Sequence, residues 1–269
     1  MAEIRPELVR IAARQVRVWR NSSTKQAPNL LLLHGGFGDA NWHWHTVWQD
    51  LADSYYVAAP DLPHFGGTVE LPNASFAELI EWLARVQELI GMTQAAVIGN
   101  SFGATLARLY ASAHPERVTH LILVDGGQIP RKSTFAQRIL RAPALASLTE
   151  WSRRQSVSEE EVQRAFANPA LVTPDVLRAS QDASHSFAAL RRQIAAGAMP
   201  QQQTPRVPTL LIWGEQDRLA NKQRAFEIAS ELDSAELPEI QLAIIRKAGH
   251  MPQLEDPASF VKIVREFVT

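Results

Sequence analysis

Short apolar runs that end at a glycine or a polar residue recur along this chain of 269 residues, and they constrain its fold most strongly. The clearest is Leu30-Leu31-Leu32-Leu33, which stops at His34. A strand that is apolar at every position is buried on both faces, and such strands form the interior of parallel sheets. The sequence therefore predicts an α/β fold, in which a mostly parallel central sheet is flanked by helices. The other runs cover residues 56–60, 95–98, 121–124, 209–213 and 242–245, and residues 8–12 and 15–19 predict an N-terminal hairpin.

One apolar run leads through Gly99-Asn100-Ser101-Phe102-Gly103 into a helical pattern. The pattern G-x-S-x-G between a strand and a helix predicts a nucleophile elbow. A chain that reverses so sharply strains its central residue, and side chains at Gly99 and Gly103 would collide. Ser101 would then stand above the carboxyl end of the sheet, and the N–H of Phe102 would lie at a helix N-terminus, where negative charge is stabilised. Alone, the pentapeptide also suits a glycine-rich turn in which the serine caps the helix.

Two further polar residues follow the last two apolar runs. Asp217 ends the turn Gly-Glu-Gln-Asp, and His250 lies in Ala-Gly-His-Met-Pro. The carboxyl ends of parallel strands meet at one edge of the sheet, so both side chains are expected near Ser101. A serine needs a base to become a nucleophile, and a carboxylate orients that base. The sequence predicts a catalytic triad of Ser101, His250 and Asp217, with Asp125 and Glu215 as alternatives for the acid.

The loop at residues 34–39 is rich in glycine, which lets backbone N–H groups approach a ligand closely. Together with the N–H of Phe102, an N–H from Phe37 or Gly36 is expected to form an oxyanion hole. The sequence does not decide between these two residues. Such chemistry requires no cofactor and no metal ion, and we expect neither.

Residues 41–53 predict a helix that carries several ring side chains next to this loop. His43 and His45 are two positions apart, and on a helix this spacing points them to different faces, which argues against a metal site. Packing is the better interpretation for both. The side chains expected at the substrate pocket are His34, Trp42 and Trp44.

The composition excludes several classes of protein. The formal net charge is −1, which gives no general reason to expect nucleic-acid binding. No apolar run is long enough to cross a bilayer, and no secretory leader is visible. The absence of cysteine excludes disulfides and thiolate metal sites. A cytoplasmic location is the expectation.

The strand pattern lapses between residues 128 and 208, which predicts an inserted helical cap, or lid. Residues 1–127 and 209–269 would then form the core domain. Basic residues outnumber acidic ones in the cap, which suits either a solvated surface or a docking patch for an acidic partner. The basic residues include Arg131, Lys132, Arg138, Arg141, Arg153, Arg154, Arg164, Arg178, Arg191 and Arg192.

These motifs together resemble those of the α/β-hydrolase family, whose triad also follows the order Ser, Asp, His. The resemblance covers residues 8–267 and implies the same sheet and a cap between two late strands. One difference lies at residues 61–68, DLPHFGGT, where many relatives have D-x-P-G-x-G-x-S. The pocket near that loop is expected to differ from theirs.

The resemblance implies a serine hydrolase, and we expect a carboxylesterase that cleaves short to medium acyl esters through an acyl-enzyme. One alternative is a C–C bond hydrolase for dienoate ring-cleavage products, whose carboxylate Arg191 or Arg192 would bind. Another is a methyl esterase for an acyl chain on an acidic carrier protein, which would dock on the basic cap. A non-enzymatic alternative is a ligand-binding receptor of the same fold.

Overall fold

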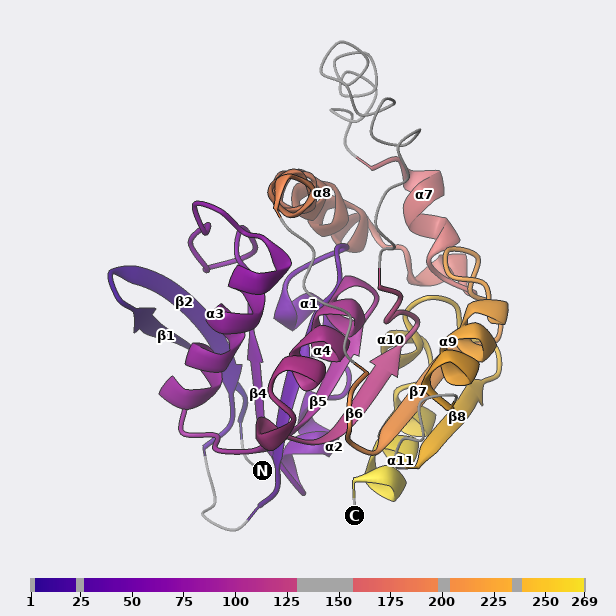
Figure 1. Ribbon diagram of the computed structural model, residues 1–269. Coiled ribbons are helices and arrows are strands. Elements are labelled where there is room, and N and C mark those ends of the chain that lie inside the picture. Colours follow the sequence, from indigo (N-terminus) through magenta and orange to yellow (C-terminus); the bar gives the residue numbers. More distant parts are fainter. Residues whose placement is uncertain (1–2, 23–26, 130–156, 198–203, 234–238, 269) are drawn as a thin grey trace.

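The computed structural model describes residues 3–22, 27–129, 157–197, 204–233 and 239–268. Eight strands form one sheet in the order β1-β2-β4-β3-β5-β6-β7-β8 (Figure 1). β1 and β2 are antiparallel and β2 pairs antiparallel with β4, whereas all the remaining pairs are parallel. The predicted α/β fold is therefore confirmed. The strands are β1 Arg5–Ile11, β2 Arg14–Arg20, β3 Asn29–Leu33, β4 Tyr56–Pro60, β5 Ala95–Asn100, β6 Val118–Val124, β7 Thr209–Gly214 and β8 Ile240–Ile245.

Helices cover both faces of the sheet, which is why its inner strands are apolar throughout. Leu31 and Leu33 pack on one side and Leu30 and Leu32 on the other, because successive side chains of a strand point to opposite faces. The first side is covered by α3 Phe76–Leu89, α4 Phe102–Ala113 and α9 Gln223–Asp233. The second is covered by α1 Ala40–Trp44, α2 Trp48–Ala52 and α11 Pro257–Phe267.

The single helix predicted for residues 41–53 is wrong, because the structure has two short helices, α1 and α2, with a break between them. A distant residue contacts the chain at this break: the hydroxyl of Thr46 donates a hydrogen bond to the carbonyl of Gln253 at 2.7 Å. Gln253 belongs to α10 Pro252–Glu255, which directly follows the loop of His250. The break thus ties the segment after the glycine-rich loop to the histidine loop.

Part of the predicted cap is described, and it lies above the carboxyl ends of the strands in Figure 1. It comprises α7 Glu159–Arg164, a 3-10 turn at Pro169–Leu171 and α8 Pro174–Ala196. Ser158 caps α7 in a reciprocal capping box with Glu161. Residues 130–156 and 198–203 of the expected cap lie outside the described residues, so its bounds stay a prediction. Among the helices described, none combines the length and apolarity that a membrane span requires.

Candidate active site

Ser101 lies where β5 turns into α4, and its backbone is strained as the motif predicts. Its φ of 55° and ψ of −114° are rare for any residue with a side chain. A Cβ atom on Gly99 would lie 2.3 Å from the carbonyl oxygen of Gly103. One on Gly103 would lie 2.2 Å from the carbonyl oxygen of Leu33. Only glycine fits at both positions, and the serine is held at the sheet edge between them.

His250 and Asp217 are brought together from two different loops. The imidazole Nδ1 donates a hydrogen bond to the Asp217 Oδ2 at 2.8 Å, and both residues are buried. The Asp217 Oδ1 accepts the N–H groups of Leu219 at 2.7 Å and Ala220 at 2.9 Å. Burial, the largest single effect, would raise the pKa of Asp217, but the hydrogen bonds that Asp217 makes and the charge of His250 together outweigh burial, so the pKa is lowered. Asp217 is therefore held as the anion.

Asn100, in the elbow itself, connects the serine to the histidine loop. Its buried side-chain amide donates to the carbonyl of His250 at 3.2 Å and to that of Val124 at 3.3 Å. The N–H of Ser101 also donates to the carbonyl of Val124 at 2.8 Å. The end of β5 thus positions both the serine and the histidine loop. The sequence did not predict this role of Asn100, because the motif G-x-S-x-G allows any residue at that position.

The hydroxyl of Ser101 makes no hydrogen bond in the part of the chain that the structure describes, and the same holds for Nε2 of His250. Catalytic hydrogen bonds are often formed only when substrate binds, so this geometry is compatible with a triad. Phe37 lies beside the imidazole, with 6.3 Å between the ring centroids.

The three backbone N–H groups expected to supply the oxyanion hole are not used in hydrogen bonds among the described residues. The N–H of Phe102 is the first of α4, where helical N–H groups lack partners. Neither it nor the N–H groups of Gly36 and Phe37 have an acceptor among the described residues. The choice between Gly36 and Phe37 for the second donor stays open.

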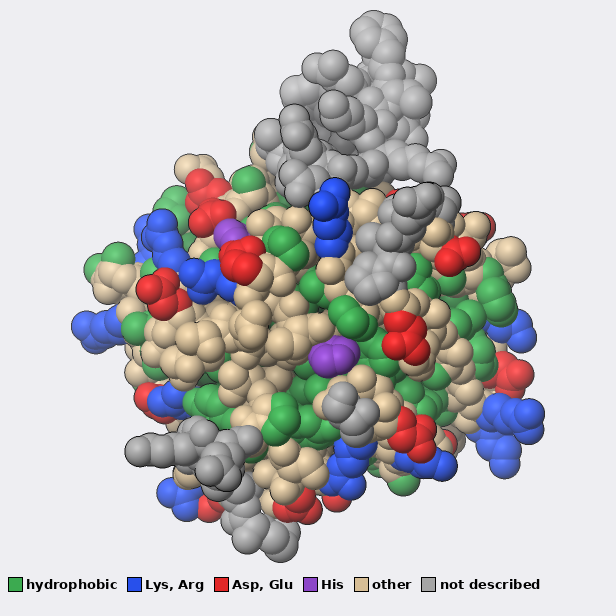
Figure 2. All heavy atoms as spheres, turned by 60° about the horizontal axis from the view of Figure 1, so that its bottom comes forward, with side chains coloured by type: hydrophobic (Ala, Val, Ile, Leu, Met, Phe, Trp, Pro, Cys, Tyr) green, Lys and Arg blue, Asp and Glu red, His purple; other side chains and the backbone are tan. Residues whose placement is uncertain are grey.

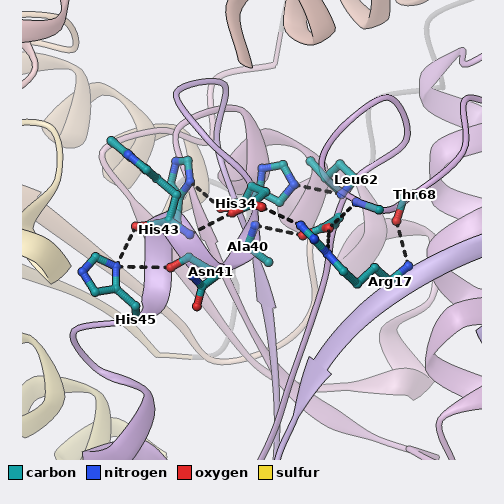
Figure 3. A network of polar contacts seen from close by, with 12 residues as sticks. Arg17, His34, Ala40, Asn41, His43, His45, Leu62 and Thr68 are labelled. Carbon is teal, nitrogen blue, oxygen red and sulfur yellow. Dashed lines mark hydrogen bonds and ion pairs between the residues drawn. The ribbon is translucent and has the colours of Figure 1, made fainter. Parts of the chain in front are cut away.

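Two buried histidines shape the glycine-rich loop (Figure 3). His43 Nε2 accepts the N–H of Gly35 at 3.1 Å, and its Nδ1 contacts the carbonyl of Asp39 at 3.1 Å. His34 Nε2 accepts the N–H of Leu62 at 2.8 Å, while its Nδ1 contacts the carbonyl of Gly35 at 2.8 Å. Each ring must therefore carry its proton on Nδ1 and stay neutral. Burial lowers the pKa of His34 and lowers that of His43 well below its usual value.

Arg17, from the second strand, fixes the same loop from its other side (Figure 3). Its guanidinium binds Asp61 at 2.5 Å and Asp39 at 2.6 Å. Asp61 also accepts the N–H groups of Ala40 at 3.1 Å and Gly67 at 3.0 Å. The loop at residues 61–68, which differs from the family pattern, is thereby joined to the glycine-rich loop. No local motif signals this role of Arg17, because its partners are 22 and 44 positions away.

The structure corrects two of the expected pocket residues. Trp44 is fully buried and packs in the core, with its ring 6.2 Å from that of Phe260. His34 is also fully buried, with both ring nitrogens bonded to backbone. Neither side chain can touch a substrate, so a pocket role for Trp44 and His34 is wrong. Trp42 is half-buried and packs near Phe37 and Phe166.

A side chain of α8, within the predicted cap, lies directly on the glycine-rich loop. A Cβ on Gly36 would meet the ring of Phe187, from α8, at 2.6 Å. The Phe187 ring is 5.4 Å from that of Phe102, the residue after the serine. The guanidinium of Arg191 lies over the Phe187 ring at 5.6 Å from its centroid. Phe187 thus packs against Gly36 and against the ring of Phe102, next to the serine.

The other histidines and acids noted in the sequence take structural positions. His45 is exposed and its Nδ1 contacts the carbonyls of its own helix, so it does not meet the buried His43 at a metal site. His64 lies 3.5 Å from Glu70. Glu215 is exposed, whereas Asp125 is buried next to Asp217. Asp125, Asp217 and His250 each place one possible ligand atom within 4.8 Å of the others, as a metal ion would need, but Nδ1 of His250 and Oδ2 of Asp217 are already joined in a hydrogen bond.

A strained serine after β5, a buried carboxylate after β7 and a histidine after β8 are the arrangement of the hydrolase class of α/β proteins. Residues 28–257 match the sequence profile described as alpha/beta hydrolase fold. The chain belongs to the α/β-hydrolase family.

Individual relatives differ in what they act on. The chain is 26% identical to the carboxylesterase YbfK of Bacillus subtilis, over 88% of this chain and 78% of that protein. It is 27% identical to a 2-hydroxymuconate semialdehyde hydrolase of Pseudomonas sp., over 98% and 94%. A solved structure of a membrane phospholipase A, a bacterial virulence factor, matches with a TM-score of 0.77 at 25% identity, over 98% of this chain and 86% of that one.

Proposed function

We propose that the protein is a carboxylesterase that cleaves esters of short to medium acyl chains through a covalent acyl-enzyme. The observation that carries the proposal is the 2.8 Å hydrogen bond between His250 and the ionised Asp217, which leaves Nε2 of the imidazole as the free basic nitrogen. That pair lies at the sheet edge where Ser101 is held in a strained turn. The similarity to the carboxylesterase YbfK supports the same activity.

In this mechanism Ser101 Oγ attacks the ester carbonyl while His250 Nε2 takes up its proton. Asp217 keeps the imidazole in the required tautomer and stabilises the imidazolium that forms. The N–H of Phe102 and one from Phe37 or Gly36 would bind the oxyanion, and losing one such donor costs about 3 to 4 kcal/mol of barrier. His250 then protonates the leaving alcohol. Water, activated by the same histidine, releases the acid and restores the serine.

The side chains around the serine favour an apolar acyl group. Phe37 lies beside His250, and Phe102 follows the serine. Phe187 packs against Phe102 from the cap. Aromatic rings give apolar contact area without placing a charge in the pocket.

Hydrolysis of a C–C bond in a dienoate is the second candidate, and Arg191 is the observation that favours it. Its exposed guanidinium lies over the ring of Phe187, which itself covers the glycine-rich loop. A guanidinium there would suit a substrate carboxylate. The similarity to the 2-hydroxymuconate semialdehyde hydrolase supports this alternative.

Docking of an acidic carrier protein receives less support. The described part of the cap, residues 157–197, carries four basic residues, Arg164, Arg178, Arg191 and Arg192, and five acidic ones. The expected basic residues Arg131, Lys132, Arg138, Arg141, Arg153 and Arg154 lie outside the described residues. The opposite end of the molecule mixes acidic and basic side chains (Figure 2).

A substrate panel tests the proposal. We expect turnover of p-nitrophenyl acetate and butyrate, and loss of that turnover in Ser101→Ala. Asp217→Asn should lower kcat by about 10⁴-fold, because the imidazole then adopts the wrong tautomer. Cleavage of a dienoate with no ester turnover, sensitive to Arg191→Ala, would select the C–C hydrolase instead. Tight ligand binding with no turnover of any panel member would indicate a receptor.

A further inference from the structure

Asp125 is a buried carboxyl group that the proposed mechanism does not use. It follows β6 directly and is 1% exposed. Its Oδ1 accepts the N–H of Gly214, at the end of β7, at 3.0 Å. Its Oδ2 is buried and has no donor among the described residues. A carboxylate oxygen buried without a donor is costly, whereas a protonated oxygen needs only an acceptor.

The acceptor is next to it. A carboxyl oxygen of Asp125 and one of Asp217 lie within 4.8 Å of each other and of an imidazole nitrogen of His250. The titratable groups that face Asp125 are Asp217, His250 and, farther off, Glu255. Two carboxylates this close in a buried place repel each other strongly, which favours a proton on one of them.

The hydrogen-bond donors around the two carboxyl groups indicate which of them carries the proton. Asp217 accepts one imidazole and two backbone N–H groups, all of which favour its ionised form. Asp125 accepts a single backbone N–H. Burial, and then the negative charge of Asp217, raise the pKa of Asp125 well above its usual value. The same arrangement therefore favours the anion on Asp217 and the proton on Asp125.

We propose that Asp125 is a neutral carboxylic acid whose Oδ2–H donates a hydrogen bond to Asp217, and that it is a positioning residue for the His250–Asp217 pair. The proton stays on Asp125 throughout turnover. Its hydrogen bond withdraws charge from the Asp217 carboxylate, which in turn accepts the Nδ1–H of His250.

Infrared spectroscopy of the full-length protein tests the protonation directly. At pH 7 the difference spectrum between the wild type and Asp125→Asn should contain the carbonyl band of one un-ionised carboxylic acid. The band should shift in D₂O, because the acid carries an exchangeable proton. A difference spectrum with only ionised carboxylate bands would overturn the proposal. This readout needs no substrate, so it stays decisive even if the proposed esterase activity fails.

The pH profile of kcat/KM tests the role of Asp125 in catalysis, and this part rests on the proposed function. Asp125→Asn keeps a neutral hydrogen-bond donor, and asparagine tolerates the positive φ of 44° at this position. The acid limb of its profile, where kcat/KM rises with pH, should therefore stay within about 0.3 pH units of that of the wild type. Asp125→Ala removes the donor, and its acid limb should move up by about half a unit. An acid limb one unit lower in Asp125→Asn would mean that Asp125 is ionised in the wild type, which contradicts the proposal.

Discussion

The carboxylate of Glu255 accepts the N–H of Gly249 at 2.7 Å, directly before His250. Its other oxygen accepts the N–H of Ala167 at 2.7 Å, just after α7 of the cap. The N–H of His250 itself donates to the carbonyl of Ala165 at 2.8 Å. One side chain thus joins the segment after α7 to the histidine loop. Sequence analysis gave no sign of it, because Glu255 lies outside every motif.

Glu255→Gln should destabilise the protein and slow it. The glutamine carbonyl can replace only one carboxylate oxygen, and its NH₂ group would face a backbone N–H. We expect a loss of about 1 to 3 kcal/mol in the free energy of unfolding, measured in urea, together with a lower kcat. Glu88→Gln, at an exposed position in the last turn of α3, is the control and should change neither quantity. Equal behaviour of the two variants would show that the contact between cap and loop is unimportant.

The strain at Ser101 predicts an effect on stability. Both Ser101→Gly and Ser101→Ala should abolish activity, since each removes the hydroxyl. Glycine adopts a φ of 55° freely and alanine does not, so Ser101→Gly should be about 1 kcal/mol more stable than Ser101→Ala in urea unfolding. A Ser101→Ala protein as stable as Ser101→Gly would indicate that the turn is not strained.

The buried histidines predict acid sensitivity. Because the pKa of His43 is lowered in the folded state, the unfolded chain binds a proton that the folded chain does not once the pH falls below about 6.5. Stability is therefore complete above that pH and is lost below it, by up to about 1.4 kcal/mol per pH unit for each such histidine. His43→Gln should reduce the slope of unfolding free energy against pH between about pH 5 and 6 by that amount. The control is His45→Gln, at the exposed neighbouring histidine, which should keep the wild-type slope.

The sheet and the elbow could both be predicted from the sequence because both depend on local patterns. Continuous apolar runs predicted the buried parallel strands, and two glycines spaced around Ser101 predicted its strained turn. What escaped prediction depends on residues that are distant in the chain. Thr46 contacts Gln253 at the break in the predicted helix, and Trp44, an expected pocket residue, packs near Phe260 in the core. No periodicity in either segment encodes the partner.

Trapping the covalent intermediate tests the central claim most directly. The wild type is mixed with p-nitrophenyl acetate, quenched in acid within the first turnover, digested and analysed by mass spectrometry. We expect one acetyl group, located on the peptide that contains Ser101, and none on that peptide from Ser101→Ala. Ester turnover that persists in Ser101→Ala, or an acetyl group on another residue of the wild type, would contradict a mechanism built on Ser101, His250 and Asp217.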